Sequence, residues 1–314
     1  MKVGVFDSGL GGLTVVDSIT KLINGVEIFY IADTKYAPYG EKSKEQILKQ
    51  SFLITDYLIK NHNIDALVVA CNSATSAAIK ELREHYTNLI VIGTEPGLKP
   101  AINQTKTNKI GVLATKATLN GTKYQDLHKT LSLNKQIEIL EEPCLGLVKK
   151  IEDGLINHHE TYSMLENWLK PMKEKNVDTI VLGCTHYPLL KDVIKKILGD
   201  EIILIETGNA IAQRLKDLAM KEGINLSKNN SLDLFYTGII NTNMIKSIIS
   251  DYTKCEKIEL RENDEWKYDR KKSFSFKIQT KKIWRFNRSN NYISNSFTCF
   301  RFKQTFSCLS FFWT

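Results

Sequence analysis

One nine-residue pattern occurs twice in the sequence, and this repeat limits the folds that the chain can adopt. Residues 64–72 read IDALVVACN, and residues 177–185, 113 positions later, read VDTIVLGCT. In each copy an uncharged β-branched and aliphatic run follows the aspartate, which predicts a strand buried on both faces of a parallel sheet. Each run ends in a small residue and a cysteine, Cys71 or Cys184, at the carboxyl end of the strand. Open α/β sheets place their ligand crevice at that end.

A second repeat has nearly the same offset. Residues 3–8 read VGVFDS and residues 110–115 read IGVLAT, so Ala114 stands where Asp7 was and Thr115 where Ser8 was. We therefore predict an α/β fold with two pseudo-symmetric, doubly wound domains, whose mainly parallel sheets face one cleft. The first domain is expected to be discontinuous, comprising residues 1–94 and 208–262, and the second to comprise residues 95–207.

A glycine-rich turn, DSGLGG at residues 7–12, stands between an expected strand and an expected helix. Glycines allow close approach of a ligand, and the helix amino terminus behind them favours an anion. The spacing is not G-x-G-x-x-G and no Walker lysine follows, so a small carboxylate suits the turn at least as well as a phosphate. Alternatively, Asp7 and Ser8 cap the helix. Similarly, Pro38, Tyr39 and Gly40 follow the expected strand at residues 26–32, either as a rigid turn or as part of the crevice.

The net charge of +8 does not describe the body of the protein. Nine of the 43 Lys and Arg lie in residues 271–314, which contain none of the 35 Asp and Glu, so residues 1–270 carry 34 basic against 35 acidic side chains. A nucleic-acid partner is therefore not expected for the body. The composition of residues 263–314, basic and rich in Phe and Ser, favours a poorly ordered tail over a segment that binds single-stranded nucleic acid. A chain ending near residue 268 is expected to keep its activity.

The sequence gives no sign of secretion, of a membrane segment or of disulfides. The chain opens on an expected strand at residues 2–6 rather than on a basic leader with an apolar core, and no apolar run approaches the length of a membrane span. Its six cysteines have no tight spacing pattern. We expect a cytoplasmic protein with free thiols.

Two facing cysteines suggest acid–base chemistry. Free cysteines are often only small buried hydrophobes, but two at matching strand ends are harder to explain in that way. No C-x-x-C motif is present, a zinc site would need more ligands at short spacing, and a nucleophilic hydrolase would need only one cysteine. Two thiols on opposite sides of a carbon suit the inversion of a stereocentre, because one removes a proton as thiolate and the other delivers one as thiol. His186 near Cys184 and Asp7 near Cys71 are plausible helpers.

The motifs at these positions resemble those of the glutamate racemases, in the Asp/Glu racemase family. The resemblance covers about residues 1–260 and is carried by DSGLGG at 7–12, ADTKYAPYG at 32–40, ACNSAT at 70–75, GVLAT at 111–115 and LGCTHYPL at 182–189. It implies a cytoplasmic enzyme that interconverts L- and D-glutamate without cofactor or metal and supplies D-glutamate for bacterial peptidoglycan. It also implies a homodimer, with no membrane or nucleic-acid partner.

The resemblance also implies roles for individual residues. Cys71 would deprotonate D-glutamate and Cys184 L-glutamate, assisted by Asp7, His186 and an acid on a helix at residues 146–154, Glu152. The substrate would be bound by residues of the strand ends and turns: Asp7, Ser8, Pro38, Tyr39, Gly40, Asn72, Ser73, Thr75, Thr115, Thr185 and His186. The sequence departs from the family at Ser73, where Thr is more usual, and at Lys149 and Lys150.

Two other functions stay open at this point. The first is a racemase for another amino acid, chiefly aspartate, although His186 after Cys184 and Thr185 favours glutamate. The second is a catalytically silent binding protein that kept the cleft. The presence of both cysteines argues against it, since loss of either would be expected first.

Overall fold

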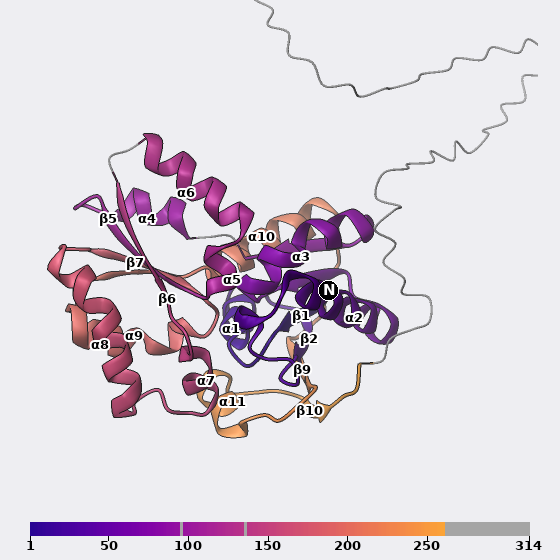
Figure 1. Cartoon of the computed structure of the whole chain (residues 1–314). Helices are drawn as coiled ribbons and strands as arrows, with labels where there is room; N and C mark the ends of the chain where they lie inside the picture. The colour runs from indigo at the N-terminus through magenta and orange to yellow at the C-terminus, as the bar shows by residue number, and fades with distance from the viewer. Residues whose placement is uncertain (95–96, 135–136, 261–314) are drawn as a thin grey trace, which may run out of the picture. The chain divides into compact units, whose positions relative to one another are not determined.

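Two parallel β-sheets account for the repeats in the sequence (Figure 1). The computed structural model describes residues 1–94, 97–134 and 137–260, without the side chains of 132–134. In spatial order the first sheet contains β10 (Lys254–Lys257), β9 (Ser231–Tyr236), β2 (Glu27–Ala32), β1 (Lys2–Asp7), β3 (Ala66–Val69) and β4 (Ile90–Gly93). The second contains β6 (Glu138–Pro143), β5 (Lys109–Ala114), β7 (Thr179–Gly183) and β8 (Ile203–Ile205).

The central strands of the two sheets pair in the same way. In the first, β3 pairs with β1 and Ala66 lies opposite Val3; in the second, β7 pairs with β5 and Thr179 lies opposite Ile110. Every strand pairing among the described residues is parallel. The predicted fold class, two similar α/β halves with parallel sheets, is confirmed. Strands β9 and β10 return to the first sheet. The exact limits of the two domains stay a prediction, and the expected tail, residues 263–314, lies outside the described residues.

Helices connect the strands, as parallel pairing requires. In chain order they are α1 (Leu13–Leu22), η1 (Tyr39–Glu41), α2 (Lys44–His62), α3 (Asn72–His85), α4 (Leu98–Gln104), α5 (Lys116–Leu119), α6 (Thr122–Asn134), α7 (Leu147–Glu152), α8 (His159–Glu174), η2 (Tyr187–Leu190), α9 (Lys191–Leu198), α10 (Gly208–Lys221) and α11 (Thr242–Ile248). A capping box begins α2, since Ser43 and Gln46 exchange side-chain and backbone hydrogen bonds. Helix α3 begins at Asn72, directly after Cys71, its N-cap residue.

The second sheet is covered on both faces (Figure 1). Val112 and Val181 belong to one buried cluster with residues of α4 and α6, while Ile180 and Leu182 belong to another with residues of α8 and α9. Alternate residues of a strand point to opposite faces, so both faces of β7 are apolar. This explains why the repeated pattern carries no charge after its aspartate.

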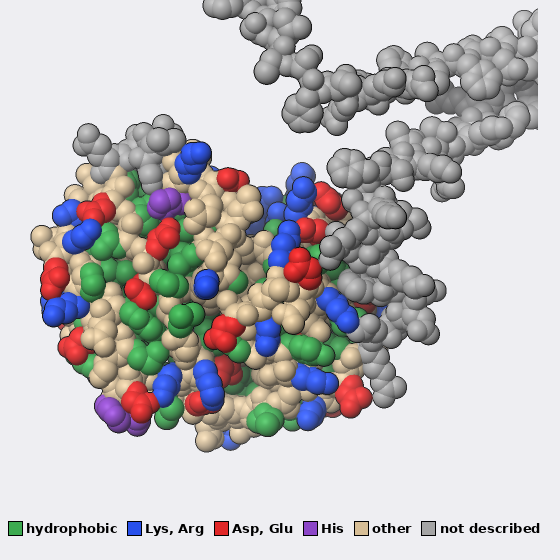
Figure 2. All heavy atoms as spheres, in the orientation of Figure 1, with side chains coloured by type: hydrophobic (Ala, Val, Ile, Leu, Met, Phe, Trp, Pro, Cys, Tyr) green, Lys and Arg blue, Asp and Glu red, His purple; other side chains and the backbone are tan. Residues whose placement is uncertain are grey.

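Side chains of both charges are interspersed on one face of the molecule. On the face drawn in Figure 2, Lys and Arg side chains lie among Asp and Glu over the described residues. No helix in the described part of the chain is long and apolar enough to cross a membrane.

The aromatic cluster at the end of α2 leads to a prediction about how stability depends on pH. The His62 ring stacks on Phe29 at 4.2 Å and lies 5.1 Å from Phe235, and its buried Nε2 has no hydrogen-bond partner among the described residues. Burial, aided by the charge of Lys254, lowers the pKa of His62. The folded state therefore favours the neutral ring, and stability is lost as the pH falls below the ordinary histidine pKa of about 6.5.

We expect H62F, which keeps the ring and removes the titration, to lose less unfolding free energy than the wild type between about pH 7 and pH 5. Urea unfolding of both proteins across this range measures the difference. Equal losses would show that His62 does not contribute to the acid sensitivity.

Candidate active site

The carboxyl ends of four central strands converge on one pocket. Strand β1 ends at Asp7, and Cys71, Thr115 and Cys184 directly or closely follow β3, β5 and β7. The space not filled by atoms in this pocket, including the part open to solvent, is about 250 Å³. It is lined by Asp7, Ser8, Pro38, Tyr39, Gly40, Cys71, Asn72, Ser73, Thr115, Val148, Cys184, Thr185 and His186. The structure thus brings together both cysteines and all but two of the predicted site residues, Glu152 and Thr75.

Glu152 reaches the site through a histidine. Cys184 Sγ lies 3.6 Å from His186 Nδ1, and His186 Nε2 lies 2.5 Å from Glu152 Oε1. The imidazole is almost completely buried. A thiol, an imidazole and a carboxylate therefore form a continuous chain that ends at the pocket wall.

This chain controls the charge of the imidazole. Burial by itself lowers the pKa of His186, but the hydrogen bonds to Cys184 and Glu152 outweigh burial, and the net pKa is raised well above its ordinary value. The hydrogen bonds to Cys184 and Glu152 therefore favour the protonated form of His186.

The side chains of Glu152 and His186 pack against the glycine-rich turn. The N–H of Leu10 donates to Glu152 Oε1 at 2.6 Å. A Cβ atom on Gly9 would lie 2.1 Å from that oxygen, and one on Gly11 would lie 2.4 Å from His186 Nδ1. From the sequence, a small carboxylate ligand suits this turn at least as well as a phosphate. The structure places a carboxylate of the protein itself there. Because Gly9 and Gly11 have no side chains, Glu152 and His186 have room beside the turn.

The other cysteine has a different environment. Cys71 Sγ donates to Ser8 Oγ at 3.9 Å, and both residues are buried. Burial raises the pKa of the Cys71 thiol well above its ordinary value, and the negative charge of Asp7 raises it further. A charge on Cys184 would act in the same direction. Cys71 is therefore a neutral thiol in this structure.

Asp7 joins the two halves and retains a free oxygen. Its Oδ2 accepts from the N–H of Gly12 at 2.7 Å and from the hydroxyl of Thr185 at 3.0 Å. Its Oδ1 is buried and has no hydrogen-bond partner among the described residues. Buried polar atoms are rarely left unpaired, so this oxygen marks a place for a donor. The expectation that Asp7 caps α1 holds only loosely, because the helix begins at Leu13 and its N-cap residue is Gly12.

Two further contacts shape the pocket. The hydroxyls of Ser73 and Thr115 lie 2.9 Å apart and connect the two halves. The hydroxyl of Tyr39 donates to the buried Asp33 at 2.5 Å, and Thr237 donates to the other oxygen of Asp33 at 2.7 Å. Burial raises the pKa of Asp33, although both hydrogen bonds oppose this effect. Asp33 thus fixes the turn that carries Pro38 and Gly40.

The structure differs from the sequence prediction at two positions. Thr75 does not line the pocket, because α3 directs its hydroxyl to the carbonyl of Val69, and it also accepts from Thr94. Val148 lines the pocket and was not predicted. An aliphatic residue inside a short helix has no sequence signal that distinguishes a pocket wall from the core.

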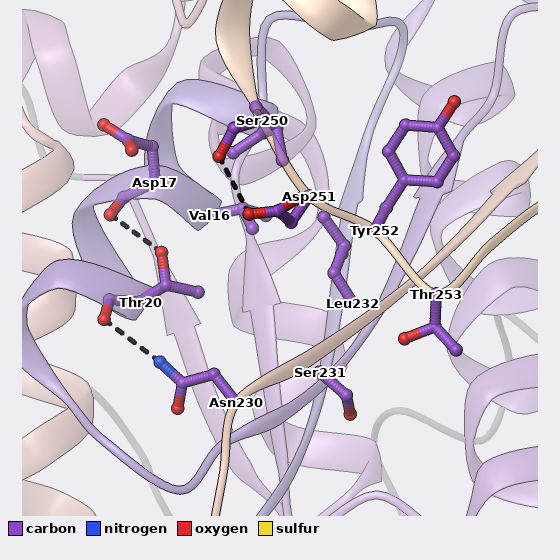
Figure 3. A pocket seen from close by; sticks show the side chains of 11 residues that line it. Val16, Asp17, Thr20, Asn230, Ser231, Leu232, Ser250, Asp251, Tyr252 and Thr253 are labelled. Atoms are coloured by element: carbon purple, nitrogen blue, oxygen red, sulfur yellow. Dashed lines mark hydrogen bonds between the residues drawn. The ribbon is translucent and has the colours of Figure 1, made fainter.

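The other hollows and the cluster of potential metal ligands among the described residues lack the paired cysteines of this pocket. The hollow in Figure 3, about 930 Å³, contains no cysteine or histidine, and hydrogen bonds join Thr20 to Asp17, Asn230 to Thr20 and Ser250 to Asp251. A hollow of about 1330 Å³ beside α10 also lacks cysteine. Three potential metal ligands of the described chain come together only at His158, His159 and Glu160, none of which lines the cysteine pocket.

Comparison with known proteins identifies the family. Residues 3–215 match the Asp/Glu/Hydantoin racemase family. The chain belongs to this family. It is 57% identical over 260 residues to the glutamate racemase of Aliarcobacter butzleri (strain RM4018), an alignment that covers 82% of this chain and 100% of that relative.

Solved structures agree with this assignment. A glutamate racemase isoform from Bacillus anthracis superposes with a TM-score of 0.72 at 31% identity, over 82% of this chain and 97% of its own. The glutamate racemase of Escherichia coli, in complex with L-glutamate and the activator UDP-MurNAc-Ala, superposes with a TM-score of 0.71 at 29% identity, over 83% and 99%.

The contact between Glu152 and His186 makes a direct prediction. E152Q removes the negative charge and keeps the shape, so the pKa of His186 should fall towards its ordinary value. We expect kcat to fall by about 10- to 100-fold if His186 takes part in proton transfer. NMR titration of ¹⁵N-labelled histidine follows the pKa, with E160Q, on the exposed start of α8, as the control. An unchanged His186 pKa in E152Q would contradict this description of the site.

Proposed function

We propose that the protein is a cofactor-independent glutamate racemase that uses two cysteines as its acid and base. The observation that carries this proposal is that both thiols line one pocket at the ends of duplicated strands. Membership of the family and 57% identity to a glutamate racemase support glutamate as the substrate.

In the proposed reaction each cysteine serves one face of the α-carbon. For L-glutamate, Cys184 as thiolate takes the α-proton, so that the Cα–H bond breaks and an S–H bond forms. The electron pair left on the α-carbon then takes a proton from the Cys71 thiol on the opposite face. D-Glutamate leaves, and the reverse reaction exchanges the roles of Cys71 and Cys184. No redox partner is needed, because one proton enters as another departs.

The surroundings of the two thiols support this assignment. A raised pKa keeps Cys71 protonated and ready to donate. The imidazolium of His186, 3.6 Å from Cys184 Sγ, would stabilise negative charge on that sulfur. Glu152 would then act as a positioning residue that keeps His186 charged.

The pocket wall offers partners for the polar groups of an amino acid. The free Oδ1 of Asp7 suits the substrate ammonium, since it is a buried acceptor without a donor. Hydroxyl and amide groups of Ser8, Asn72, Ser73 and Thr185 would bind the carboxylates. Thr75 would act only indirectly, by fixing the start of α3.

We also propose that the enzyme acts in the cytoplasm as a homodimer that supplies D-glutamate for peptidoglycan. This part rests on resemblance to the family. Light scattering on the purified protein would test the dimer. Incubation with L-glutamate and, separately, L-aspartate would identify the substrate, with racemisation of glutamate as the expected result.

Cysteine substitutions test the two-base scheme. C71A and C184A should each lower racemisation of both enantiomers by at least about 10³-fold, because each direction needs both groups. Binding of glutamate, measured by calorimetry, should persist. C255A changes a half-buried cysteine on β10 and should keep the wild-type rate. Near wild-type racemisation by either single variant of the pocket would refute the scheme.

A further inference from the structure

Tyr30 connects the first sheet to the glycine-rich turn without reaching the cysteine pocket. It lies in β2, its side chain is completely buried, and it is not among the residues that line the pocket. Its hydroxyl donates to the carbonyl of Gly9 at 2.5 Å. A Cβ atom on Gly12 would lie 2.8 Å from the same hydroxyl oxygen, so this hydroxyl packs closely against two residues of the turn. Tyr30 therefore restrains the backbone of the turn.

The carbonyl that Tyr30 binds belongs to a peptide group with a second partner. The C=O of Gly9 and the N–H of Leu10 are parts of one planar peptide unit, in which the two groups point in opposite directions. That N–H donates to Glu152 Oε1 at 2.6 Å. Because the unit is rigid, a hydrogen bond that fixes its oxygen also fixes the direction of its N–H.

From Glu152 the contacts continue to a reactive thiol. Glu152 Oε1 lies 2.5 Å from His186 Nε2, and His186 Nδ1 lies 3.6 Å from Cys184 Sγ. A peptide unit fixed by Tyr30 thus stands at the start of a continuous path to the sulfur.

The hydroxyl of Tyr30 is a lasting donor in this path. Burial raises the pKa of Tyr30 well above its ordinary value, and the negative charges of Asp7 and Glu152 raise it further. The hydroxyl therefore stays protonated at neutral pH and brings no charge into the site.

We propose that Tyr30 is a positioning residue for the Cys184 side of the reaction, because it holds the Gly9–Leu10 peptide unit where Glu152 can keep His186 beside the thiol. The inference rests on the proposed function and adds to it a residue of β2, in the half opposite Glu152. Tyr30 does not line the pocket, so it acts only through other residues. Loss of its hydroxyl should therefore slow proton transfer more than it weakens the binding of glutamate.

The kinetics of Y30F test this proposal, because the change removes only the hydroxyl. We expect kcat to fall by about tenfold and KM to change by less than about twofold, since a small misplacement of a catalytic group slows the chemical step. Y86F is the matched control, because the hydroxyl of Tyr86 also donates to a group of the first half, Asp56 at 2.7 Å, where α2 lies beside the end of α3. Y86F should keep the wild-type kcat. Rates are compared per folded molecule, with the folded fraction taken from urea unfolding.

A double-mutant cycle separates positioning from a general structural effect. E152A removes the carboxylate through which Tyr30 is proposed to act. In a protein that already carries E152A, Y30F should lower kcat by less than about twofold. A structural effect that does not pass through Glu152 would lower kcat by the same factor in both backgrounds.

The ring ¹⁵N resonances of His186 provide a reading that needs no activity. In Y30F they should move in the same direction as in E152Q, by a smaller amount, and in Y86F they should stay in place. An unchanged kcat in Y30F, a loss confined to KM, equal losses with and without E152A, or unmoved His186 resonances would each overturn the inference, while racemisation by the wild type kept the proposed function intact. If the wild type did not racemise glutamate, the proposed function would fail, and the His186 resonances alone would decide whether Tyr30 positions the Glu152–His186 pair.

Discussion

The contact between the glycine-rich turn and the Glu152–His186 pair holds the two halves of the site in register. Residues far apart in the sequence meet there, since Leu10 donates to Glu152 and Gly11 lies against the ring of His186. Any side chain at Gly9 or Gly11 would occupy the space of the carboxylate or the imidazole. Because the imidazole in turn reaches Cys184, the position of one reactive thiol depends on a turn in the opposite half.

The fold is nearly symmetric, but its chemistry is not. The repeat places Ala114 where the first half has Asp7, and His186 where the first half has Ser73. Consequently Cys71 lies near a carboxylate, whose charge adds to burial in raising the pKa of the thiol, while Cys184 lies near His186, whose pKa is also raised. Two similar strand ends thus place their thiols in different electrostatic surroundings in the same pocket.

Sequence analysis predicted the parallel sheets and the meeting of both cysteines because a repeated buried strand has a repeated position in the fold. It could not predict the contact between Glu152 and the glycine-rich turn, since the partners lie 142 residues apart and no local pattern links them. Thr75 was assigned to substrate binding from its place in a motif, but the helical turn that begins at Asn72 directs it towards Thr94.

Hydrogen exchange during racemisation tests the central claim most directly, since two bases on opposite faces cannot return the same proton. Wild-type protein is incubated in D₂O with L-glutamate and, separately, with D-glutamate, and deuterium at the α-carbon is measured by mass spectrometry at low conversion. The account predicts that the product carries deuterium while the recovered substrate does not, in both directions. Substantial retention of the original α-hydrogen in the product would indicate a single base and would contradict it.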